Sequence, residues 1–402
     1  MSFIDRRRFL QTSAALGSAA LFSPFAFGQT ASGRRLVLVQ LSGGNDGLST
    51  VVPYGDDEYY AARNVTAIGK RAVLPLDDYR GLHPNLKRLH AAFEAGQMAI
   101  IEGVGYPDAV RSHFKSLEIW HTANLGGRNA ADGWAGRLAQ TAFGDEPATD
   151  RVVHIGKYAP YSLFAQGASP TVLESPTGYR WFGQIAETET LGHAAEGEGM
   201  AETGKGRDAA LSRLRDILSD AQASSGRVRS AAARYRPAVQ YPRETFGAQL
   251  FDLAALIHGS PQTRVCSAAL SGFDTHADQR ATHDRLMTRL DDCLGAFLED
   301  LGHSEVGRDT LIVVFSEFGR RVRENGSRGT DHGQAGPMFV LGHRIKPGLF
   351  GEHPSLEKLA GGDLKFTTDF RRVYATVSER WFGVDTKSVL GDTYRPLDFL
   401  PS

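Results

Sequence analysis

The chain has 402 residues, of which 41% are hydrophobic and 23% are charged, a composition that excludes an intrinsically disordered protein. The two cysteines exclude a disulfide-stabilised scaffold and a cysteine-rich metal module. The 45 lysines and arginines nearly balance the 46 aspartates and glutamates, for a formal net charge of −1. We therefore expect no nucleic-acid partner.

The first 28 residues resemble an export signal and not a part of the fold. Three arginines at 6–8 precede an uncharged stretch at 12–27, which ends in small residues suited to cleavage. The apolar stretch is too short for a typical membrane-spanning helix, and a short membrane anchor is the alternative. Paired arginines before Phe-Leu resemble the twin-arginine signal, so we expect the twin-arginine export machinery as a partner. Residues 29–402 then form a periplasmic or secreted protein without a transmembrane segment after processing.

In the rest of the chain, apolar runs of strand length alternate with segments of helical periodicity. The expected strands lie at 36–41, 98–105, 152–156, 264–270, 310–315 and 337–342. The expected helices lie at 82–95, 112–123, 208–235, 246–257, 286–301 and 370–382. Continuous apolar strands are typical of a parallel sheet that is buried on both faces.

The alternation predicts an α/β fold with a mostly parallel central sheet and helices on both faces. We expect it to form a single domain at 29–402. A stretch rich in glycine and glutamate near 187–206 predicts a flexible surface insertion.

Acidic residues and histidines gather in the loops beside the strongest expected strands. These residues are Asp46, Asp274, His276, Glu317, Asp331 and His332. Because ligands of parallel α/β sheets bind beyond the carboxyl ends of the strands, we expect these side chains to meet at one edge. Carboxylates together with imidazoles suit a divalent ion such as Zn²⁺ or Mn²⁺. Two such ions would clamp the oxygens of a phosphoryl or sulfuryl group during transfer.

Several of these candidates also have a purely structural interpretation. Asp46 lies in an Asn-Asp-Gly stretch, which is common turn chemistry. Asp274 suits the cap of a helix that begins near residue 277, and Glu317 suits a surface ion pair with Arg320 or Arg321. The metal-site prediction therefore depends on the set as a whole.

Two further residues are candidates for catalysis. Ser112 lies at the start of an expected helix, where the helix terminus and a metal ion would favour its ionised hydroxyl; the alternative is a simple N-cap. Arg320 follows Glu317 by three residues, and a guanidinium binds phosphate or sulfate oxygens through two parallel hydrogen bonds. The adjacent Arg321 is equally suited, and the alternative for both arginines is a solvated surface position.

The sequence lacks several catalytic motifs. It contains no Gly-x-Ser-x-Gly, no phosphate-loop Gly-Lys-Ser/Thr, no His-Glu-x-x-His and no Gly-x-Gly-x-x-Gly. These absences disfavour an α/β-hydrolase, an ATPase, a zincin and a Rossmann dehydrogenase.

Five motifs occur in a characteristic order after the arginine-led signal. They are QLSGGNDG at 40–47, RSHF at 111–114, GFDTH at 272–276, SEFGR at 316–320 and GTDHG at 329–333. Together they resemble a large family of twin-arginine-exported bacterial proteins without an agreed function, which is grouped with the alkaline phosphatase and sulfatase superfamily.

The resemblance implies an alkaline-phosphatase-like fold and an exported, metal-dependent hydrolase of phosphate or sulfate esters. Its substrate would be a small-molecule or polysaccharide ester, and its cofactor a divalent metal such as Zn, Mn or Ca. The alternatives are a non-catalytic binding or assembly protein that retains the fold, and a metal-dependent phosphomutase or isomerase.

The resemblance also implies roles for the residues of the amino-terminal motifs and of the late loop. Asp46 is similar to the aspartate after the first strand, and Ser112 to the nucleophile. His332, with Asp331 beside it, is similar to a late histidine ligand.

The remaining loops carry the other implied ligands and one departure. Asp274 and His276 are similar to an Asp/His ligand pair, although their spacing is shorter than in phosphatases. Glu317 stands at the position of an acidic ligand. Phe318 stands where a histidine or asparagine ligand follows in those enzymes, which argues against a complete second metal site. The absence of a Cys-x-Pro/Ser-x-Arg signature excludes a modified cysteine nucleophile.

Overall fold

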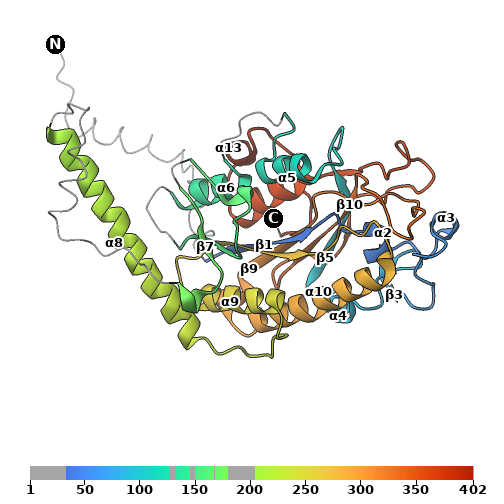
Figure 1. Cartoon of the computed structure of the whole chain (residues 1–402), viewed down its shortest axis with the longest axis horizontal. Coiled ribbons are helices and arrows are strands. Elements are labelled where there is room, and N and C mark those ends of the chain that lie inside the picture. The colour runs from blue at the N-terminus through green and yellow to red at the C-terminus, as the bar shows by residue number, and fades with distance from the viewer. Residues whose placement is uncertain (1–32, 127–131, 145–149, 167, 180–203, 402) are drawn as a thin grey trace, which may run out of the picture.

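The computed structural model describes residues 33–126, 132–144, 150–166, 168–179 and 204–401. The predicted export signal at 1–28 lies outside the described residues, and so does the predicted insertion except for 204–206. Strands from residue 35 to residue 369 join one nine-stranded sheet (Figure 1). Its order is β11-β5-β10-β9-β1-β8-β6-β7, and β12 pairs with β5.

The strands of this sheet include all six that the sequence predicts. They are β1 (Arg35–Ser42), β5 (Met98–Gly105), β6 (Val152–Ile155), β7 (Thr171–Leu173), β8 (Val265–Ser271), β9 (Thr310–Phe315), β10 (Gly336–Leu341), β11 (Gly348–Phe350) and β12 (Thr368–Asp369). Only β10 runs against its neighbours, β5 and β9, and the other pairs in this described sheet are parallel. The predicted mostly parallel sheet is confirmed.

Helices cover both faces of the sheet, as predicted. Alternate residues of β1 enter two separate cores: Val37 and Val39 face one side, and Leu36 and Leu38 face the other. The first core lies against α4 (Lys87–Glu94), α9 (Thr245–Gly259) and α10 (Gln279–Gly302). The second lies against α5 (His113–Thr122), α6 (Trp134–Phe143), α12 (Phe370–Thr376) and α13 (Thr386–Leu390). Figure 1 shows α9 and α10 below the sheet and α5 and α6 above it.

The helix predicted at 82–95 begins later in the structure than in the prediction. The residues before α4 form β4 (Gly81–Leu82), which pairs with β2 (Val51–Val52) and β3 (Leu74–Pro75) in a small antiparallel sheet. Pro84 disfavours helical geometry at the residue before it, so the helix begins only at Lys87.

Short helical segments complete the described fold. They are α2 (Gly47–Thr50), α3 (Asp57–Ala62), η1 (Tyr161–Leu163), η2 (Pro176–Gly178), α11 (Glu305–Arg308) and the π-helical turn η3 (Val377–Trp381).

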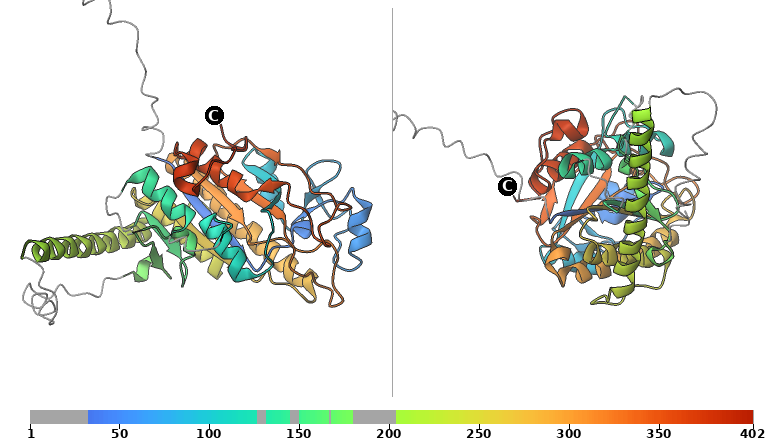
Figure 2. Two further views of the ribbon diagram at one scale, coloured as in Figure 1. Left: turned by 90° about the horizontal axis from the view of Figure 1, so that it is seen from above. Right: turned by 90° about the vertical axis from the view of Figure 1, so that its left-hand side faces the viewer.

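The long helix α8 (Gly204–Arg234) projects away from the body of the molecule, as the left view in Figure 2 shows. Its carboxy-terminal part packs onto the core beside α9 through Val228 and Ala231, which are buried. Within the described part of the chain, no helix combines the length and the apolar character needed to cross a membrane.

Candidate metal centre

Four loops and the start of one helix meet at a single edge of the sheet. The strands β1, β8 and β9 are parallel, so their carboxyl ends share this edge. The antiparallel strand β10 begins at the same edge, and β5 ends there before the chain enters α5. The topology therefore brings together the loops that the sequence predicts to carry the site.

Gly43 allows the first two of these loops to approach closely. Its φ is +121°, and a Cβ at this position would overlap the backbone nitrogen of Asp274. The predicted turn after β1 thus serves to place the Asp274 loop against β1.

Three imidazoles surround the carboxylate of Asp274. Nε2 of His332 lies 3.0 Å from Oδ1 of Asp274, and Nε2 of His276 lies 3.1 Å from the same oxygen. Nε2 of His113 lies 3.6 Å from Oδ2. His113, Asp274 and His332 offer ligand atoms that all lie within 4.8 Å of one another, and among the described residues no other such group of three occurs.

Each of these imidazoles is held through its other nitrogen. Nδ1 of His113 lies 2.8 Å from Oε1 of Glu317, and Nδ1 of His276 lies 3.2 Å from Oδ1 of Asp331. Nδ1 of His332 lies 2.9 Å from the backbone carbonyl oxygen of Arg111. Because all three partners are acceptors, a neutral ring that donates through Nδ1 presents the lone pair of its Nε2 to the centre of the cluster.

This proton arrangement is suited to a cation. The Nε2 atoms of His276 and His332 are 3.0 Å apart, and both face the Asp274 carboxylate. Acceptors so close together repel one another unless a cation or an added proton lies among them. Metal-binding histidines are typically held in this way, with a carboxylate or a carbonyl on the second nitrogen. The residues present therefore fit a divalent metal ion.

Asp274 is ionised over a wide pH range. Burial opposes its ionisation, but the hydrogen bonds with His332 and Arg320 outweigh this and lower its pKa to about 2. The Asp274 side chain is 49% exposed. The carboxylate is therefore charged and open to solvent, and so accessible to a metal ion.

The acidic residues Glu317 and Asp331 lie behind the imidazoles. The buried Glu317 accepts hydrogen bonds from the backbone nitrogen of Gly43 at 2.9 Å and from His113. Asp331 accepts from Asn325 at 3.0 Å and from His276. Both were predicted as metal ligands; in this structure each contacts a histidine and lies outside the group of three that could hold an ion.

Asp46, also predicted as a ligand, is engaged elsewhere. Its carboxylate is fully buried and accepts hydrogen bonds from both terminal nitrogens of Arg63, from Ser49 at 2.8 Å and from Gln279 at 2.5 Å. Burial raises the pKa of this carboxyl, but the charge and hydrogen bonds of Arg63 outweigh burial and hold the pKa well below its usual range. In this structure Asp46 therefore lies outside the group of three that could hold an ion, and its metal ligation stays a prediction.

Arg320 is buried as well, and this geometry does not support the predicted anion-binding role. Its guanidinium donates to the carbonyl oxygens of Gly43, Gly44, Phe273 and Thr330 and to Oδ1 of Asp274. Its side chain has no exposed surface. Arg320 thus joins three loops of the site, and in this structure its guanidinium is fully occupied by protein acceptors.

Ser112 and His113 stand at the start of α5. Ser112 is the N-cap residue, is exposed, and makes no side-chain capping hydrogen bond. The sequence prediction considered Ser112 in this motif and missed His113 as a ligand. A histidine in the first turn of the same helix, directly beside a proposed nucleophile, was the available signal.

Phe318 fills the space between two of the ligands. Its ring centroid lies 4.9 Å from that of His113 and 4.5 Å from that of His332. The residue is buried, and it holds both imidazoles in place by packing. Phe318 therefore makes an apolar contact at the position where the resemblance implies a histidine or asparagine ligand.

Several solved structures are similar to this chain. A protein of the alkaline phosphatase superfamily from Vibrio parahaemolyticus is 11% identical, with 88% of this chain and 72% of that chain covered and a TM-score of 0.34. The zinc complex of the carboxy-terminal periplasmic domain of EptC from Escherichia coli is 9% identical, with coverages of 77% and 72% and a TM-score of 0.39. The sulfatase PsFucS1 from a Pseudoalteromonas species is 14% identical, with coverages of 91% and 76% and a TM-score of 0.36. At TM-scores below 0.5, we draw no function from these similarities.

The comparison with curated proteins found no match. The family described as a protein of unknown function, DUF1501, matches residues 95–393. This match covers well over half of the chain and contains every residue of the metal centre. The chain belongs to the DUF1501 family.

Proposed function

We propose that the protein is a metal-dependent hydrolase of phosphate or sulfate esters. The observation that carries the proposal is the convergence of His113, Asp274 and His332, with His276 beside them and Asp274 half-exposed. Three protein ligands leave a coordination position open, which is typical of catalytic and not of structural metal sites.

The chain's own residues limit the choice of metal. His113 and His332 would bind the ion through Nε2, and Asp274 would bind it through its carboxylate. Two imidazoles favour Zn²⁺ or Mn²⁺ over Ca²⁺, which takes oxygen ligands. When bound, such an ion polarises the ester oxygens and stabilises the negative charge that develops on them.

His276 and Ser112 are the residues that we propose to act on the ester. Asp331 holds Nδ1 of His276, so Nε2 faces the metal ligands and is available to transfer a proton to or from a reacting oxygen. Ser112 is exposed and directly precedes the ligand His113. We assign Ser112 as the nucleophile and His276 as the general acid and base.

Two arginines offer the positive charge that an ester dianion requires. Arg111 and Arg321 both pair with the buried carboxylate of Asp363, and their side chains are 39% and 36% exposed. Two guanidinium groups beside one carboxylate leave an excess positive charge. Arg111 also accepts the hydrogen bond of His332 on its backbone carbonyl, so the backbone of Arg111 lies next to the candidate metal centre.

Metal content tests the centre directly. The purified full chain should bind about one equivalent of Zn²⁺ or Mn²⁺, judged against one full-occupancy site. The variant His332→Ala should lose the ion, and the matched control His303→Ala, which changes an exposed histidine at the end of α10, should keep it. Less than about a tenth of an equivalent in the wild-type chain would overturn the metal centre.

Turnover tests the reaction. With metal bound, the chain should hydrolyse p-nitrophenyl phosphate or p-nitrophenyl sulfate, and His332→Ala should lose about a hundredfold or more of this activity, since the metal supplies several kcal/mol of charge stabilisation. Metal binding without turnover on either ester would contradict the hydrolase and favour a binding protein that retains the fold.

Export is a separate part of the proposal. The arginines at 6–8 and the uncharged stretch after them support delivery to the periplasm by the twin-arginine machinery. Replacing Arg6 and Arg7 with lysine should keep the precursor in the cytoplasm, as cell fractionation would show. Unchanged export of this variant would contradict the assignment of the signal.

A further inference from the structure

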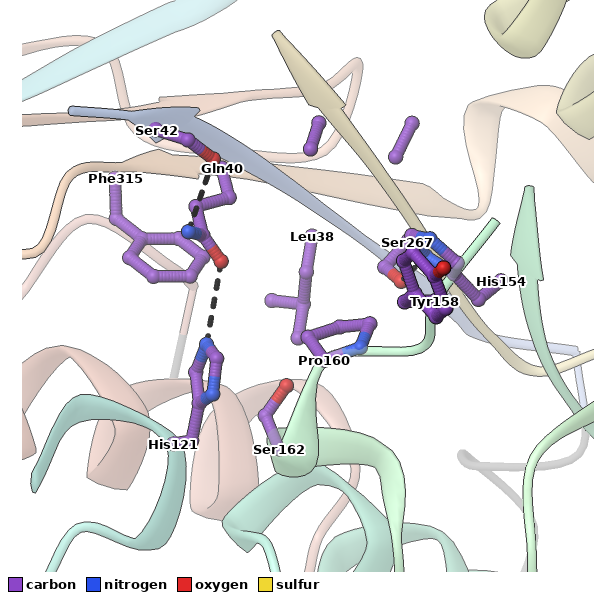
Figure 3. Close-up of a pocket in the computed structure, with 12 residues that line it drawn as sticks. Leu38, Gln40, Ser42, His121, His154, Tyr158, Pro160, Ser162, Ser267 and Phe315 are labelled. Atoms are coloured by element: carbon purple, nitrogen blue, oxygen red, sulfur yellow. Dashed lines mark hydrogen bonds between the residues drawn. The ribbon is translucent and has the colours of Figure 1, made fainter. Parts of the chain in front are cut away.

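A cavity lies on the sheet face that α5 covers (Figure 3). Its volume is about 210 Å³. It lies between β1 and β8 on one side and the segment around Pro160 together with α5 on the other. Figure 3 shows Gln40, His121 and Ser162 projecting into the space from these different elements.

The cavity interrupts a face that is otherwise apolar. Leu36 and Leu38 of β1 point into the core on this face, but the next residues on the same face are Gln40 and Ser42. On the neighbouring strand β8, Val265 is followed on this face by Ser267. Polar side chains on a helix-covered sheet face are uncommon in a core, and such groups converging in a cavity are typical of a ligand site.

Hydrogen bonds fix the polar groups of the wall. Nε2 of Gln40 donates to Oγ of Ser42 at 3.0 Å, and Oε1 of Gln40 lies 3.2 Å from Nε2 of His121. Nδ1 of His154 lies 2.7 Å from Oγ of Ser267. His121 and His154 are 6% and 5% exposed, so both imidazoles are part of the fold and not of a mobile surface.

The wall carries no formal charge at neutral pH. Among the described residues that line the cavity, none is an aspartate, glutamate, lysine or arginine. Burial lowers the pKa of both His121 and His154 to about 4, which leaves both rings neutral. Leu38, Pro160 and Phe315 add apolar surface beside the polar groups.

We propose that this cavity binds a neutral, hydroxyl-rich group of the size of one sugar ring. Its volume equals about seven water molecules at roughly 30 Å³ each, and it is below the roughly 300 Å³ at which pockets for drug-sized ligands begin. Hydroxyl groups match the donors and acceptors of the wall, and the C–H faces of a sugar ring match its apolar part. An ionic ligand finds no counter-charge there.

The cavity is distinct from the metal centre. The helix α5 connects them, with His113 at its first residue and His121 in its last turn. Eight residues of helix separate these two side chains by about 12 Å. The sugar-site proposal therefore does not depend on the proposed hydrolase, and binding can be measured without turnover.

Ligand-observed NMR on the full chain tests the cavity. The probes are glucose, galactose and mannose, with glucuronate and glucosamine as charged comparators. At least one neutral sugar should bind saturably, and the charged sugars should bind more weakly. Ala269→Leu, which fills the cavity from β8, should weaken sugar binding by about tenfold or more. The loss of one hydrogen bond or packing contact typically weakens affinity by about this factor. The matched control Ala91→Leu, on the exposed side of α4, should not change it.

Two more variants keep the test decisive. If Ala269→Leu does not fold, Ser267→Ala removes one wall hydroxyl and should weaken binding by about three- to tenfold. His332→Ala should bind the sugar as the wild type does. The proposal is overturned if no neutral sugar binds, if only charged sugars bind, if the cavity variants bind unchanged, or if His332→Ala abolishes binding and so places the sugar at the metal centre.

Discussion

Replacing Asp46 with asparagine separates a structural role of this residue from metal ligation. The carboxylate and Arg63 are both completely buried, and the two groups form a bidentate ion pair. Asparagine keeps the shape of the side chain but removes its charge. The guanidinium of Arg63 then stays buried without a counter-ion.

The structure sets the magnitude of the effect. Removal of one partner of a buried ion pair typically costs about 3–5 kcal/mol. Arg63 also donates to the carbonyl oxygens of Val322 at 2.9 Å and Arg321 at 3.0 Å, and the variant keeps both bonds. We therefore expect a loss at the lower end of this range, about 3 kcal/mol in the free energy of unfolding. A protein with a typical stability of about 5–15 kcal/mol still folds after this loss.

Urea unfolding and metal analysis together give the assay. Asp46→Asn should lower the free energy of unfolding and keep the metal ion. Asp274→Asn, which changes a half-exposed carboxylate, should lose the ion with a smaller change in stability. An Asp46→Asn protein that stays within about 1 kcal/mol of wild type but loses its metal would refute the reasoning and restore Asp46 as a ligand.

Three further predictions follow from individual contacts. Glu317→Gln should weaken metal affinity by about 10–100-fold, because the neutral amide orients His113 less well; an unchanged affinity in metal titration would show that Glu317 has no such role. Ser112→Ala should lose most turnover yet change stability by less than about 0.5 kcal/mol, because no capping hydrogen bond is lost; retained turnover would remove Ser112 from the mechanism. His121 and His154 have pKa values lowered to about 4 by burial, against about 6.5 in an unfolded chain. Between these values the unfolded state binds more protons, so stability should fall as pH drops from 6.5 to 4, by up to about 3 kcal/mol for each histidine. A free energy of unfolding that is flat across this window, in urea titrations at several pH values, would contradict the neutral state of both rings.

The fold could be predicted closely from sequence because its strands are nearly continuous apolar runs. β9 lies at the predicted residues, and β1 extends the prediction by one residue at each end. The antiparallel direction of β10 could not be predicted in this way, because hydrophobic periodicity indicates which residues are buried and not which way a strand runs. The start of α4 was missed because the β4 strand before it continues the apolar spacing of the helix.

The site was predicted less well, because the role of each loop residue depends on partners far away in sequence. Asp46 and Arg63 are 17 residues apart, and nothing local in the sequence signals their pairing. Glu317 is in the right loop, but only the three-dimensional structure places His113 between it and the metal position. Residue type and loop position therefore identify the site, while burial and hydrogen bonding assign the roles.

The motif at 316–320 illustrates how residues that resemble catalytic groups can build a site without contacting the substrate. Glu317 orients one histidine ligand, and Phe318 packs against two of them. A side chain at Gly319 would overlap the carbonyl oxygen of Ala335, so the loop can lie this close to β10 only with glycine there. Arg320 then joins the loops that follow β1 and β8 and holds the carboxylate of Asp274. Residues 317–320 of the motif therefore each have a structural explanation, and under the proposed function the groups that remain to bind the substrate anion are Arg111 and Arg321, which pair with Asp363.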